Sequence, residues 1–214
     1  EMLARYRTDA RVMHITGDNY QEEMHGYPYS YYFSIYSHIW GWAAWRRTWT
    51  KFDYDMESWK SIRENRAAIR ELMFGVHTAS SRKYRTSQFD KMVFEDSGDI
   101  WDYRYVYSLW RNKGLTVIPA VNLVQNIGAG EAATHLKTIS PIKSRQSESM
   151  SFPLVHPSAV AVNKKLDRHV EKRDYQYRNY CKTVKRLVET FKEGGIKGVC
   201  RTITGIADRL LRRG

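Results

Sequence analysis

The segment from Asp96 to His135 constrains the fold of this chain more than any other part of the sequence. It reads DSGDIWDYRYVYSLWRNKGLTVIPAVNLVQNIGAGEAATH, which predicts an acidic loop, a helix, a buried strand and a glycine-containing loop that ends in a histidine. Residues 115–124 form a near-continuous apolar run without alternation, which is typical of a strand covered on both faces. A helix followed by such a strand predicts an α/β fold.

Two acids mark the start of the helix predicted over residues 101–112. Asp99 is expected at the N-cap, with Asp102 three residues later. At about 100° per residue, the apolar side chains form one broad arc, and Asp102 falls in its middle. A carboxylate on a core-facing surface is costly unless it is paired, bound to metal or turned into a cleft. Asp102 is therefore a candidate functional residue, whereas Asp99 on its own could be a plain helix cap.

A tryptophan-rich segment, SHIWGWAAWRRTW, supplies the second candidate site. Gly41 is expected to open a helix that carries three indole rings on one face: Trp42, Trp45 and Trp49. The stripe could fill the core, or it could line a cleft in which the rings stack on a sugar or nucleotide. Periodicity alone favours the core.

The rest of the first 95 residues predicts short elements. In order, they are the end of a helix (1–8), strands over 11–16 and 29–37, a charged helix ending at Gly75, a mobile basic loop (76–88) and a helix over 86–94. His14, inside the first strand, is predicted to be a packed residue and not a metal ligand.

The net charge of +12 suggests an acidic partner, but much of the excess follows Lys137. The sequence divides into residues 1–140, a linker or docking segment (141–162) and a basic helical tail (163–214). Within the tail, residues 196–213 place apolar and basic side chains on opposite sides of a helix. That pattern fits either an anionic membrane surface or packing against a protein. Nucleic-acid binding would depend on charge alone, so we expect no nucleic-acid partner.

Five ordered motifs resemble the C-terminal half of bacterial GT-A glycosyltransferases of the family 2 or "hemolysin-like" nucleotide-diphospho-sugar transferase type. They are RVMHITGDNYQ, SHIWGWAAWRRTW, GDIWDYRYVYSLWRNKGL, PAVNLVQNIGAGEAATH and FPLVHP, and they span roughly residues 1–157. The resemblance implies the acceptor-side half of a GT-A fold, with a helical C-terminal extension. It also implies that the acidic DxD motif and the first nucleotide-binding strands belong upstream, so we expect this chain to be a fragment that is inactive alone.

The resemblance implies roles for the residues that match. Asp99, or Asp102 as the second candidate, would take the proton from the acceptor hydroxyl, and Asp102 could instead orient the acceptor. His135 would complete the shell of a divalent cation, Mn²⁺ or Mg²⁺, shared with the absent acidic motif. The donor- and acceptor-binding candidates are Trp40, Gly41, Trp42, Arg46, Arg47 and Trp101, with the arginines neutralising diphosphate charge.

The expected activity is transfer of a sugar from a nucleotide-sugar donor to a surface glycan or lipid-linked acceptor. The expected location is cytoplasmic, peripheral at the inner face of the membrane. A binding module that holds a glycan or a membrane without catalysis is the alternative.

Overall fold

The computed structural model describes residues 1–21, 24, 26–95, 100–125, 146–172 and 188–192. The chain divides into two compact units, Glu1–Glu171 and Lys172–Gly214. Residues 163–171, which the sequence analysis placed in the tail, therefore belong to the first unit. Asp99, His135 and residues 196–213 lie outside the described residues.

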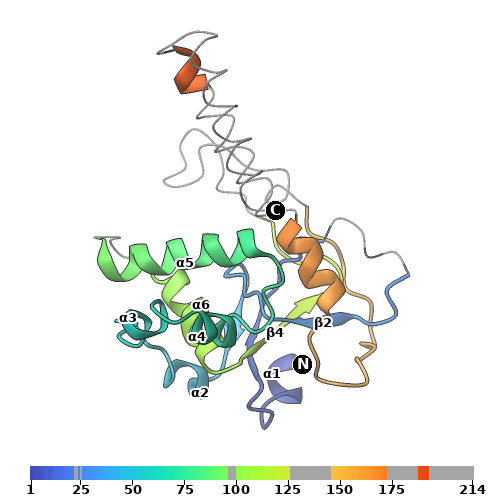
Figure 1. Cartoon of the computed structure of the whole chain (residues 1–214). Helices are drawn as coiled ribbons and strands as arrows, with labels where there is room; N and C mark the ends of the chain where they lie inside the picture. The colour runs from blue at the N-terminus through green and yellow to red at the C-terminus, as the bar shows by residue number, and fades with distance from the viewer. Residues whose placement is uncertain (22–23, 25, 96–99, 126–145, 173–187, 193–214) are drawn as a thin grey trace. The chain divides into compact units, whose positions relative to one another are not determined.

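A four-stranded mixed sheet forms the centre of the described part of the first unit (Figure 1). Its order is β2 (Tyr31–Ser34), β4 (Leu115–Pro119), β1 (Val12–Ile15) and β3 (Ala43–Ala44). Strand β4 runs parallel to β1 and antiparallel to β2. All of β4 is buried, as its near-continuous apolar run predicted, so the α/β class is confirmed.

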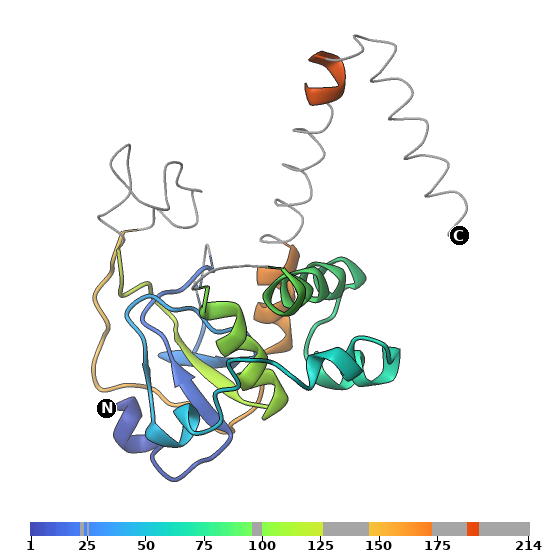
Figure 2. The same cartoon turned by 90° about the vertical axis from the view of Figure 1, so that its left-hand side faces the viewer.

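The register of the sheet gives its two faces different chemistry. His14, Thr116 and Ser34 are in register across three strands, and so they share one polar face. Ile15, Val117 and Phe33 are likewise in register and make the other face apolar. Figure 2 shows the green helices, α5 (Ala79–Phe94) and α6 (Asp102–Arg111), on one side of the sheet and the N-terminal helix α1 (Met2–Arg5) on the other.

Helix α6 (Asp102–Arg111) packs its apolar side on the sheet, where Tyr105 and Leu109 form a cluster with Met13. Because α6 leads directly into β4, its N-terminus lies at the edge where β1 and β4 end. Trp101 occupies the N-cap position and Asp102 the first helical position, so the helix begins two residues later than the predicted Asp99 cap.

Two helix predictions were wrong. The segment from Gly41 does not begin a helix, because β1 takes the backbone hydrogen bonds of Ala43 and Ala44, and only α2 (Arg46–Trp49) is helical. The predicted loop 76–88 is mostly helix α5 (Ala79–Phe94), whose first turn is capped by the Thr78 side chain. The segment before Gly75 is helical, but it forms two short helices, α3 (Trp59–Ile62) and α4 (Arg66–Leu72), where a single helix was predicted.

Candidate functional site

Three indole rings from separate elements converge beside the first turn of α6. The ring centroid of Trp42 lies 5.7 Å from that of Trp101 and 5.8 Å from that of Trp49. The ring of Trp42 also contacts that of Tyr105, at a centroid distance of 5.6 Å, and Trp42 is partly buried. Trp49 is 43% exposed and presents its ring at the surface. The structure thus brings two predicted binding residues together, Trp42 and Trp101.

His14 supports this cluster from the sheet. Its ring stacks on Trp42 at a centroid distance of 5.4 Å. Its Nε2 donates to the carbonyl oxygen of His38 at 2.7 Å, and burial lowers the pKa of His14 to about 4. The ring is therefore neutral at pH 7, and Nδ1 accepts the Tyr105 hydroxyl at 3.2 Å. The prediction that His14 is a packed residue is confirmed.

The Trp40–Gly41–Trp42 segment lies against the loop that follows β1. The carbonyl oxygen of Trp40 accepts the amide of Gly17 at 3.4 Å and the hydroxyl of Thr16 at 3.3 Å. A Cβ on Gly17 would come within 2.9 Å of the Gly41 carbonyl oxygen and 2.7 Å of Val124. Gly41 adopts φ +55° and also faces Val124. The two glycines therefore permit this close approach of three loops.

Gly41→Ala is expected to destabilise the first unit by about 2–3 kcal/mol, because the new methyl group overlaps Val124 Cγ2 and φ is positive. Gly26→Ala is the matched control, since Gly26 also has positive φ (+72°) but no atom within 4 Å of a Cβ. It should cost only about 1 kcal/mol. Urea unfolding of both variants measures the difference. Equal losses would show that backbone strain, and not the contact with Val124, sets the effect.

Asp18 and His38 form a buried pair at the end of β1 that the sequence analysis missed. Asp18 Oδ1 accepts His38 Nδ1 at 3.0 Å and the Thr16 hydroxyl at 2.5 Å. Asp18 is 1% exposed, and its Oδ2 has no hydrogen-bond partner among the residues that the structure describes. A carboxylate directly after a buried strand was the available signal, because ligands bind α/β sheets where their strands end.

Asp102 is half-buried at the start of α6, and its Oδ1 accepts the amide of Tyr103 at 2.9 Å. The sequence placed this carboxylate among apolar side chains, which would be costly in a core. At the N-terminus of α6 the helix dipole stabilises its charge. Asp102 lies at the same edge of the sheet as Asp18, where β1 and β4 end.

The two arginines occupy different environments. The guanidinium of Arg47 lies within the domain and donates to the carbonyl oxygens of Arg7, Tyr6, Asp9 and Val12 at 2.8–3.1 Å. Arg47 therefore ties the segment after α1 to α2 and is not presented to a diphosphate. Arg46 is exposed.

In the part of the chain that the structure describes, no three His, Cys, Asp or Glu side chains come together as potential metal ligands. His135 lies outside that part, so a divalent cation stays a prediction.

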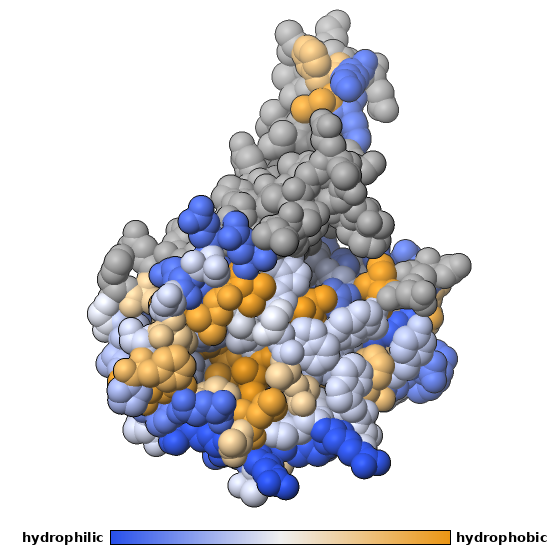
Figure 3. Space-filling view, turned by 180° about the vertical axis from the view of Figure 1, so that it is seen from behind, coloured by the Kyte–Doolittle hydropathy of each residue, from blue (hydrophilic) through white to orange (hydrophobic). Residues whose placement is uncertain are grey.

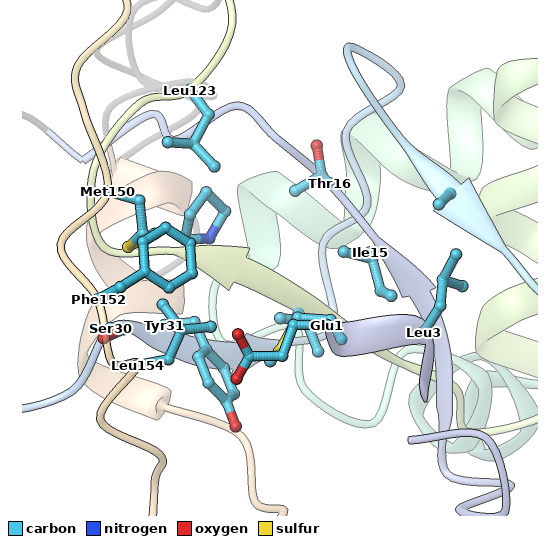
Figure 4. A pocket seen from close by; sticks show the side chains of 14 residues that line it. Glu1, Leu3, Ile15, Thr16, Ser30, Tyr31, Leu123, Met150, Phe152 and Leu154 are labelled. Atoms are coloured by element: carbon cyan, nitrogen blue, oxygen red, sulfur yellow. The ribbon is translucent and has the colours of Figure 1, made fainter. Parts of the chain in front are cut away.

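The apolar face of the sheet carries a separate cavity of about 320 Å³ between α1, the sheet and residues 150–154 (Figure 4). Figure 3 shows hydrophobic side chains gathered around a hollow on this side of the molecule. Ile15, Val117 and Pro119 line its floor, and Phe152 at its rim is 70% exposed. None of the predicted site residues lines this cavity.

The fold and the site define a mixed α/β protein whose candidate site lies where two parallel strands end. Comparisons of the chain with protein-family models, with curated proteins and with solved structures find no match. Of the helices in the described ranges, none has both the length and the apolar character needed to span a bilayer.

Proposed function

We propose that this chain is the acceptor-side part of a GT-A-type glycosyltransferase, which transfers a sugar from a nucleotide-sugar to a surface glycan or lipid-linked acceptor. The observation that carries the proposal is the meeting of Trp42 and Trp101, 5.7 Å apart, beside Asp102 at the edge where β1 and β4 end. Ligands of α/β proteins bind at that edge of the sheet.

The side chains at this edge suit a sugar acceptor. Indole rings offer flat apolar faces to the C–H side of a pyranose, and a carboxylate accepts its hydroxyl groups. Trp101 is partly buried against the cluster, so its ring is held in place before a ligand arrives. The adjacent carboxylate of Asp102 would orient the acceptor hydroxyl or take its proton as the oxygen attacks the anomeric carbon.

The proposal includes a divalent cation, Mn²⁺ or Mg²⁺, and a donor diphosphate. When bound, the cation would neutralise charge on the leaving diphosphate. With Arg47 committed to backbone carbonyls, exposed Arg46 is the arginine that remains for the diphosphate. The basic segment 196–213 would hold the enzyme at an anionic membrane surface.

Release of nucleoside diphosphate tests the proposal. The chain, and a version extended upstream, are incubated with UDP-, GDP- and dTDP-hexoses in Mn²⁺ or in EDTA. We expect turnover in the extended version that requires Mn²⁺. Glycan binding without turnover in either version would instead support the non-catalytic module.

A further inference from the structure

Residues 163–171 are tied into the first unit by contacts to β2 and its neighbours. The amide of Asn163 donates to the carbonyl oxygen of Phe33 at 2.8 Å, and the Gln21 side chain donates to that of Leu166 at 3.0 Å. Residues 164–171 are helical, and the helix, orange in Figure 1, lies beside β2. This helix is the connection between the first unit and residues 172–214.

Two buried carboxylates, one helical turn apart, hold this helix. Asp167 is 0% exposed and accepts the Ser34 hydroxyl at 2.6 Å and the Ile35 amide at 3.2 Å. Glu171 is 1% exposed and accepts the Tyr36 hydroxyl at 2.8 Å. It also accepts two backbone amides, from His77 at 2.8 Å and Thr78 at 2.9 Å, just before α5. All five donors are neutral.

No lysine or arginine among the described residues forms an ion pair with either carboxylate. Other titratable or charged groups lie around the Asp167–Glu171 pair. Strand β2 and the residues after it contribute Tyr32, Tyr36 and His38. Helix α5 and the segment before it contribute Arg85 and His77. Two like charges buried this close disfavour each other, so one proton stabilises the pair.

The hydrogen-bond partners decide which carboxyl carries that proton. Glu171 faces two backbone N–H groups, which can only donate, so both of its carboxyl oxygens are used as acceptors. Asp167 faces the Ser34 hydroxyl, which can reverse and accept from a protonated carboxyl. Burial and, to a smaller extent, the nearby Glu171 raise the pKa of Asp167 to about 7. Its hydrogen bonds to Ser34 and Ile35 act in the opposite direction and are outweighed.

We propose that Asp167 is a proton-operated latch, which holds helix 164–171 against β2 when protonated and loosens it when ionised. An aspartate in the unfolded chain ionises at about pH 3.9, whereas in the latch it keeps its proton to about pH 7. The stabilisation is therefore complete at low pH, falls between about pH 4 and 7, and is absent above pH 7. Attachment of the segment that leads to residues 172–214 thus responds to pH near neutrality.

Hydrogen exchange of the full chain between pH 5 and 8, corrected for intrinsic rates, tests the latch. The opening constant of residues 163–171 should rise by up to about tenfold per pH unit below pH 7 and level off above it. Asp167→Asn, which cannot ionise, should remove that dependence, whereas Asp55→Asn at an exposed position should keep it. A flat profile in the parent chain, or an unchanged slope in Asp167→Asn, would overturn the proposal.

Infrared spectroscopy of the parent chain gives a second measurement that needs no variant to fold. A protonated carboxyl C=O band should be present at pH 6 and lost by pH 8. Its absence at pH 6 would show that Asp167 is ionised in the folded chain and would also overturn the latch.

Discussion

Asp102→Asn is expected to lower turnover of a nucleotide-sugar by about 10²- to 10⁴-fold while the fold is retained. The amide oxygen of asparagine can still accept the Tyr103 N–H, which the carboxylate accepts at 2.9 Å, so the start of α6 is preserved. An amide cannot take a proton from the acceptor hydroxyl, so proton transfer is the function that is removed. Loss of the charge at the helix N-terminus should cost only about 0.3–1 kcal/mol of stability.

Diphosphate release by the active version of the chain measures this effect, with circular dichroism as the check on folding. Asp55→Asn is the control, because Asp55 is an exposed aspartate away from the cluster. If Asp102→Asn keeps full activity, Asp99→Asn is the next variant, since the resemblance gives that position the same role. Full activity in both would remove the transferase proposal.

Arg47→Ala is expected to destabilise the first unit by about 2–3 kcal/mol, whereas Arg46→Ala should change stability by less than about 0.5 kcal/mol. The Arg47 guanidinium satisfies four backbone carbonyls between Tyr6 and Val12. Alanine would leave these acceptors without their charged donor and would remove the side-chain tie between residues 6–12 and α2. Arg46 is exposed, so its removal leaves no buried group unpaired.

Urea midpoints of the two variants give the comparison, and titration with a nucleoside diphosphate adds the functional readout. Weaker diphosphate binding in Arg46→Ala, with unchanged stability, would support its role at the donor. Equal stability in the two variants would contradict the structural assignment of Arg47.

The sequence predicted elements well where local pattern and tertiary environment agree. The buried strand β4 and the amphipathic helix α6 were both predicted correctly. Burial of a strand on two faces, or of a helix along one side, determines where apolar residues fall in the sequence. The Trp42–Trp45–Trp49 spacing predicted one helix from Gly41, and this was wrong. A spacing of three or four residues also arises in an extended segment that is followed by one helical turn. Pairing of Ala43 and Ala44 with β1 decided that case.

The candidate site was predictable only in part. Trp42, Trp101 and Asp102 stood out as aromatic or acidic residues in helical patterns, and the structure places the two indoles in contact. Asp18 and His38 are twenty residues apart, and neither carries a local signal of pairing. Asp167 and Glu171 fall within the predicted basic tail, where nothing singled them out, yet both are buried.

The sequence by itself determined the α/β class, the buried strand and the acid at the start of α6, since each follows from hydrophobic periodicity and helix-end chemistry within a short window. Only the tertiary structure decided which charged side chains are interior: Arg47 among carbonyl oxygens, Asp18 against His38, and the Asp167–Glu171 pair against β2 and α5. Burial of a charge depends on donors and acceptors brought from distant segments, and that arrangement exists only once the chain has folded.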